Sequence, residues 1–168
     1  MKGKILLSAI ALVAIIVAAC STSKLTPEEK AAEKMRIADA VASAIDNRRF
    51  KVEIDYMKPF RGPNRHLSFG YEIRVSGDTL YSYLPYFGAA YNVPYGGGKG
   101  LNWEAPLTGY QVTPGRKGAT IVEMTAYNGE DYFLYSFELM PNGAAYLNVR
   151  SRDREPISFS GDMDLRTN

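Results

Sequence analysis

The 168 residues carry 20 Lys and Arg against 18 Asp and Glu, which gives a formal net charge of +2. Because this charge is nearly balanced, the composition excludes the concentrated basic surface of a nucleic-acid-binding protein. A single cysteine and a single histidine exclude an intrachain disulfide and any zinc site built from several Cys or His ligands. Twelve tyrosines and seven phenylalanines favour a protein rich in β-sheet.

The first nineteen residues have the pattern of an export signal. Lys2 and Lys4 form a positively charged start, and the stretch 5–19 has Ser8 as its only polar side chain. As a helix, these fifteen residues would span roughly 22 Å at ~1.5 Å per residue, short of the ~30 Å hydrocarbon core. We therefore predict a cleaved signal peptide over residues 1–19 rather than a permanent transmembrane anchor.

The segment Val17-Ala18-Ala19-Cys20 resembles the bacterial lipobox. The resemblance implies cleavage between Ala19 and Cys20 and lipid on the Cys20 sulfur, so the expected partner is a membrane reached through that lipid. The alternative is an ordinary secretory signal that happens to precede a cysteine. Residues 20–25 are expected to form a short lipidated tether. A serine, Ser21, follows the cysteine, which resembles the sorting pattern of lipoproteins on the periplasmic face of the outer membrane. We expect a lipid-anchored protein of the cell envelope.

A helix is predicted to begin at Thr26 and to end near Asn47. Thr26 and Glu29 have the spacing of a capping box, and Pro27 suits a first helical turn. The small apolar residues expected to form its buried stripe are Ala31, Ala38, Val41, Ala42 and Ile45. The stripe is narrow and rich in alanine, which favours a helix that packs on a sheet.

From Phe50 onward the hydrophobic period changes to two. Val52, Ile54 and Tyr56 alternate with Lys51, Glu53 and Asp55, which indicates a strand with one wet face. Tight turns are predicted at Ser76-Gly77-Asp78 and Asn128-Gly129. The expected strands are 50–56, 69–76, 79–84, 107–112, 120–127, 131–140, 144–151 and 157–163. Their short connections predict an antiparallel meander of seven or eight strands. The fold class is therefore α+β, with residues 26–168 as one domain and the sheet either open or curled into a partial barrel.

Several segments in order resemble the lipoprotein family called domain of unknown function 4251. They are Phe50-Lys51-Val52-Glu53-Ile54, Tyr71 to Asp78, Tyr83 to Tyr91, Asn142-Gly143-Ala144-Ala145 and Ile157 to Gly161, of which Leu84-Pro85-Tyr86-Phe87-Gly88 is the most specific. The resemblance covers nearly all of the chain after the signal. It implies an exported lipoprotein with a helix and an antiparallel sheet, and it supplies no catalytic residue, ligand or partner.

The residues of chemical interest give no convincing catalytic set. His66 is expected in a solvated loop between strands, and the run Gly96 to Gly100 lacks the Ser or Thr and the following helix of a phosphate-binding loop. Acid pairs at Glu130-Asp131 and Asp162-Met163-Asp164 are expected to be solvated. We expect no catalytic residues, no metal ion and no cofactor, although two distant acids could still meet in three dimensions as a glycosidase pair.

The remaining candidate is an aromatic loop, in which tyrosine and tryptophan would offer contact area and polar groups. Its residues are Tyr86, Tyr91, Tyr95 and Trp103. The competing interpretation is that Leu84, Phe87 and Tyr91 plug one end of the sheet as core. Replacement of Tyr95 and Trp103 by alanine is expected to weaken binding without unfolding the chain.

The leading functional hypothesis is a non-enzymatic domain that binds an envelope protein or a glycan and no nucleic acid. The first alternative is a carboxylate-based hydrolase or carbohydrate-processing enzyme. A second alternative is a carrier of small ligands, if the sheet encloses an apolar cavity.

Overall fold

The structure is a computed structural model that describes residues 26–68, 70–92 and 98–166. The predicted signal peptide 1–19, its expected cleavage between Ala19 and Cys20, and Tyr95 lie outside the described residues. The chain separates into two compact units, 1–32 and 33–168. All strands belong to the second unit. Across the described ranges, no helix combines the length and apolar character that a membrane crossing requires.

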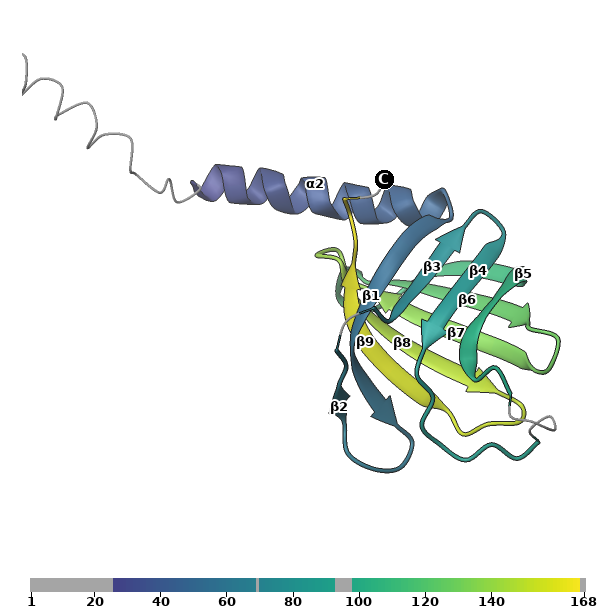
Figure 1. The fold of residues 1–168 in the computed structure, drawn as a ribbon. Coiled ribbons are helices and arrows are strands. Elements are labelled where there is room, and N and C mark those ends of the chain that lie inside the picture. Colours follow the sequence, from purple (N-terminus) through teal and green to yellow (C-terminus); the bar gives the residue numbers. More distant parts are fainter. Residues whose placement is uncertain (1–25, 69, 93–97, 167–168) are drawn as a thin grey trace, which may run out of the picture. The chain divides into compact units, whose positions relative to one another are not determined.

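In the part of the chain that the structure describes, one α-helix precedes a sheet of nine antiparallel strands (Figure 1). The helix is α2 (Pro27–Asp46), and a short 3-10 turn, η2 (Arg116–Gly118), lies between two of the strands. The strands are β1 (Arg49–Pro59), β2 (Arg65–His66), β3 (Glu72–Ser76), β4 (Thr79–Leu84), β5 (Leu101–Pro114), β6 (Thr120–Tyr127), β7 (Tyr132–Leu139), β8 (Ala144–Ser151) and β9 (Ile157–Met163).

The predicted capping box opens α2. The Thr26 backbone N–H donates to Glu29 Oε2 at 2.7 Å, and the Glu29 N–H donates to Thr26 Oγ1 at 3.2 Å, so two backbone donors of the first turn are satisfied. The buried face differs from the expected stripe, because Ala42 is exposed and Ala44 is buried with Val41 and Ile45.

The sheet closes on itself. Neighbouring strands follow the order β1-β3-β4-β5-β6-β7-β8-β9, and β9 also pairs with β1, so eight strands form a closed barrel (Figure 1). The two-residue β2 adds outside this ring, where Tyr56 pairs with His66. The predicted α+β class, the antiparallel meander and its curling into a barrel are confirmed. The barrel is complete rather than partial. The sheet has nine described strands, one more than the seven or eight expected.

The β1–β9 pairing, called the seam here, is reinforced beyond the strand ends. The Asp164 N–H donates to the Lys51 carbonyl at 2.9 Å, and the Asp164 carboxylate accepts from Lys51 Nζ at 2.8 Å and from Arg166 Nε at 3.0 Å. The hydrogen bond from Lys51, then those from Arg166, hold the pKa of Asp164 well below its usual range. Because the folded pKa lies below the unfolded value of about 4, this contribution to stability is present above pH ~4 and is lost on acidification.

A bulge in β1 overturns one expected orientation. Val52 and Ile54 point into the barrel as predicted, but Tyr56 is exposed and Met57 is buried. The register between β1 and β9 shifts between Ile54 and Tyr56, which leaves Asp55 as an extra residue. An extra residue exchanges the two faces of a strand from that point on. Tyr56 therefore lies on the outer face of the barrel.

The barrel interior is a packed core. Its largest fully buried side chains include Phe133, Tyr135 and Phe137 on β7, and the Tyr135 hydroxyl lies 2.9 Å from Ser82 Oγ. Burial raises the pKa of Tyr135. Within the described residues, the inward side chains form one continuous apolar cluster, which argues against a carrier that holds a ligand inside the barrel.

Candidate functional site

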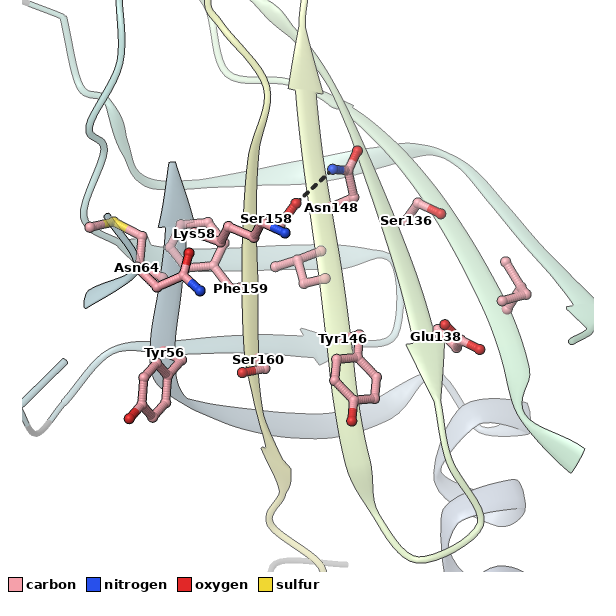
Figure 2. A pocket seen from close by; sticks show the side chains of 13 residues that line it. Tyr56, Lys58, Asn64, Ser136, Glu138, Tyr146, Asn148, Ser158, Phe159 and Ser160 are labelled. Carbon is pink, nitrogen blue, oxygen red and sulfur yellow. Dashed lines mark hydrogen bonds between the residues drawn. The ribbon is translucent and has the colours of Figure 1, made fainter. Parts of the chain in front are cut away.

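A groove of about 470 Å³ crosses the outer face of β1, β9, β8, β7 and β6 (Figure 2). Its size lies within the range of small-molecule sites. Most of the lining consists of side chains that point outward from these strands. The inward side chains of the same strands form the core. The lining residues are Tyr56, Met57, Lys58, Asn64, Ile121, Ser136, Glu138, Tyr146, Leu147, Asn148, Ser158, Phe159 and Ser160.

The strand register places four of these residues in a cross-strand line, called the tyrosine row here. Ser160 on β9 is the direct partner of both Tyr56 on β1 and Tyr146 on β8, and Tyr146 is opposite Glu138 on β7. Directly opposite side chains project to the same face of a sheet and lie next to each other. Figure 2 shows the four side chains in this order, with the short Ser160 between the two phenol rings.

A second line, called the polar row, runs parallel to the first. Lys58 is opposite Ser158, Ser158 is opposite Asn148, and Asn148 is opposite Ser136 (Figure 2). Asn148 Nδ2 donates to Ser158 Oγ at 3.0 Å, and Asn148 Oδ1 accepts from Arg150 Nε at 2.9 Å. The side-chain amide is therefore fixed in orientation, and one of its two N–H donors is left for a ligand.

Both tyrosines of the groove present their rings to solvent. Tyr56 is 46% exposed and Tyr146 is 54% exposed. The Tyr56 ring meets the edge of His66 at a centroid distance of 5.0 Å, so the single histidine supports a tyrosine of the groove. His66 lies on β2 and is exposed, which is more ordered than the loop position expected for it.

The groove chemistry is that of a binding surface. Of the described residues in its lining, Lys58 is the only cation and Glu138 the only carboxylate, and none is a histidine or a cysteine. Hydroxyl and amide groups of Ser136, Asn148 and Ser158 supply donors and acceptors. Among the described residues, no group of three or more His, Cys, Asp or Glu side chains is arranged to hold a metal ion.

A second groove, of about 680 Å³, is acidic. Its lining includes Glu53, Asp55, Glu72 and Asp162, and Glu53 is the direct cross-strand partner of both Glu72 and Asp162. Opposed acids of this kind repel one another. Lys51 Nζ offsets part of the repulsion at 3.1 Å from Glu53 Oε1.

Hydrogen bonds attach the aromatic loop after β4 to the barrel. The Tyr86 hydroxyl is 2.8 Å from the Ala89 carbonyl and 3.1 Å from the Glu155 carbonyl, and the Ala89 N–H donates to the buried Glu155 carboxylate at 3.0 Å. Burial raises the pKa of Tyr86. Tyr86 is thus a structural anchor of the loop. Of the three residues expected to plug this end of the sheet as core, Leu84 is buried, whereas Phe87 and Tyr91 are exposed.

The other expected loop residues separate in space. Tyr91 is 69% exposed. Trp103 does not lie in the loop: it is in β5, only 7% exposed, with its ring 5.0 Å from Phe133 and 5.7 Å from Tyr135 between centroids. The expected placement of Trp103 on a binding loop is wrong, because β5 starts at Leu101 and directs this side chain into the core.

Comparison with known proteins agrees with the fold described above. The family model described as "Domain of unknown function (DUF4251)" matches residues 31–163. The chain belongs to the DUF4251 family. A solved DUF4251 structure from Bacteroides eggerthii DSM 20697 is similar to this one, with 12% sequence identity, a TM-score of 0.59, and coverage of 79% of this chain and 89% of that chain. No curated protein matches the sequence.

In this DUF4251 chain, the sequence pattern does not reveal most residues of the groove. No local motif marks Tyr146, Asn148, Ser136 or Glu138, and the alternation in β9 indicates only that Ser158 and Ser160 face outward. One signal was present in the sequence: the outward positions of β8 and β9 carry tyrosine, asparagine and serine where Lys and Glu are usual. Membership of the DUF4251 family assigns no activity to these residues.

Proposed function

We propose that this DUF4251 protein is a lipid-anchored, non-enzymatic domain of the cell envelope that binds an envelope component in the groove across β1, β9, β8 and β7. The observation that carries the proposal is the groove itself. It combines two exposed tyrosines with a fixed amide and several hydroxyls. Its single carboxylate, Glu138, has no second acid beside it in the lining, and two-carboxylate hydrolysis requires a pair.

The anchor part of the proposal rests on the first twenty residues. We expect a fatty-acid analogue fed to cells to label the wild-type protein and to leave a Cys20→Ala variant unlabelled, because the lipid is attached to that sulfur. Several acyl chains at about 0.8 kcal/mol per buried methylene make attachment effectively permanent. Mass spectrometry of the N-terminal peptide should show modified Cys20 as the first residue. Bare Cys20, or a retained leader, would contradict the anchor, and density-gradient fractionation tests the assignment to the outer membrane.

Photo-crosslinking tests the groove. A benzophenone amino acid at Ser160 of the full-length, lipidated chain is expected to form adducts in intact envelopes, because Ser160 lies between Tyr56 and Tyr146. The same amino acid at Gln111, which is exposed on β5 and outside both grooves, is the matched control. Absence of adducts at position 160, or the same adducts at both positions, would refute a binding role for the groove.

The acidic groove supports a second candidate function, a carboxylate-based hydrolase, because Glu53 has an acid on each neighbouring strand. Release of reducing sugar from envelope polysaccharide by the full-length chain, abolished in Glu53→Gln, would favour this candidate. Equal release by wild type and variant would remove it. The binding function ranks first because the acids of the second groove face one another as like charges, and Glu53 is already paired with Lys51 at 3.1 Å.

A further inference from the structure

We propose that the groove binds a neutral saccharide and that one sugar ring lies between Tyr56 and Tyr146. This inference rests on the proposed function and names the ligand class for the same groove. It follows from three features of the outer face: the spacing of the two tyrosines, the donors of the polar row, and the charge of the lining.

The spacing suits a single sugar ring. Tyr56 and Tyr146 are both direct partners of Ser160, so they are two strands apart. Neighbouring strands are about 4.8 Å apart, which places the two tyrosine backbones roughly 10 Å apart. A ring with a carbon contact of about 3.5–4.0 Å on each side needs nearly this separation. The short Ser160 side chain leaves the space between the phenols open (Figure 2).

The polar row offers what sugar hydroxyls require. A sugar hydroxyl both donates and accepts a hydrogen bond, as do the hydroxyls of Ser136 and Ser158. The Asn148 amide is already held by Ser158 and Arg150, so less side-chain freedom is lost when it binds a ligand. Because this row runs beside the tyrosine row, a ring stacked on the phenols would direct its hydroxyls toward these groups.

The lining charge favours a neutral ligand. Among the described residues of the lining, Lys58 on β1 and Glu138 on β7 are the only charged ones, and β9 and β8 lie between their strands. A phosphorylated or sulfated ligand would meet one cation and one anion, so it would gain little net attraction. An extended peptide is also disfavoured, because the four strands are paired on both sides and offer no free backbone edge for strand addition.

A glycan array tests the inference. The full-length chain in detergent would be applied to neutral oligosaccharides of glucose, mannose, galactose and N-acetylhexosamines, with sulfated and phosphorylated counterparts beside them. We expect binding to at least one neutral class. Tyr56→Ala and Tyr146→Ala should each weaken it about tenfold, because each removes one buried ring face. Tyr83→Ala, a 48% exposed tyrosine on β4 outside both grooves, should leave it unchanged, and melting curves would verify that all variants fold.

The outcomes separate this inference from the proposed function. Absence of binding to every neutral glycan overturns the saccharide assignment, and so does a preference for the anionic counterparts. Glycan binding that survives both groove substitutions overturns the site. If the array is negative while position 160 still crosslinks a protein, the groove remains a binding surface and only the ligand class fails. If position 160 yields no adduct at all, the proposed function fails as well.

Discussion

A Gly161→Ala variant is expected to be strongly destabilised, because the added methyl group has no space. Gly161 lies on β9 at the seam, opposite Ile54 of β1. A Cβ built at this position overlaps the Glu53 carbonyl oxygen and falls 2.8 Å from the Glu53 carbonyl carbon and 2.9 Å from Ile54 Cα. These are backbone atoms of the neighbouring strand, so no side-chain rotation relieves the overlap. We expect a cost of about 3 kcal/mol or more.

Urea unfolding followed by circular dichroism measures this cost. The matched control is Gly109→Ala on β5, where the new methyl group would meet only the Thr125 hydroxyl, which rotation about χ1 can move away. The control should lose much less stability than Gly161→Ala. Unfolding midpoints that coincide for Gly161→Ala and wild type would show that β1 and β9 are not held as closely as described.

A Trp103→Ala variant is expected to be destabilised by about 3–5 kcal/mol, the usual cost of removing a large buried aromatic side chain. Trp103 packs in the core against Phe133 and Tyr135. The indole is the only one in the chain, so the wild-type fluorescence should report a buried environment and shift to the red on unfolding. This expectation reverses the one drawn from the sequence, in which Trp103 could be replaced without loss of the fold.

Tyr91→Ala provides the control for the tryptophan substitution. Tyr91 lies on the connection between β4 and β5, before the strand that holds Trp103, and it is exposed. Its replacement should therefore change the free energy of unfolding by less than about 0.5 kcal/mol. Equal stability of Trp103→Ala and Tyr91→Ala would contradict the assignment of Trp103 to the core.

Local signals in the sequence predicted most of the elements correctly. The capping box at Thr26 and Glu29 opens α2, and Gly77 with Asp78 connects β3 to β4. At the second predicted turn, Asn128 Oδ1 accepts from the N–H groups of Glu130 and Asp131. Each of these features depends on residues within a few positions of one another, so a sequence pattern is sufficient to reveal it.

Features that depend on a partner strand were not predictable in the same way. The alternation of Val52, Ile54 and Tyr56 predicts one shared face, but the bulge that turns Tyr56 outward exists only in the pairing with β9. Trp103 follows a glycine-rich run and therefore looks like a loop residue, whereas pairing with Ser82 on β4 makes it part of a strand. Tertiary pairing overrides the local pattern at both positions.

The groove belongs to the same class of non-local features. Its residues on β1 are far in sequence from those on β7, β8 and β9, and the polar ones look individually like ordinary solvent-facing positions. Tyr56 and Tyr146 flank Ser160 only because β9 lies between β1 and β8. This adjacency is a product of barrel closure, and a single sequence does not contain the register that creates it.

The closed ring also has a consequence for biogenesis. Its first strand pairs with its last, as Val52 does with Met163. Contacts between positions so distant in sequence slow folding. During synthesis, a nascent chain that still lacks β9 would present β1 and β8 with unpaired hydrogen-bonding edges, which favour association with other chains. Chaperone protection of the emerging polypeptide until the final strand arrives would therefore suit this architecture.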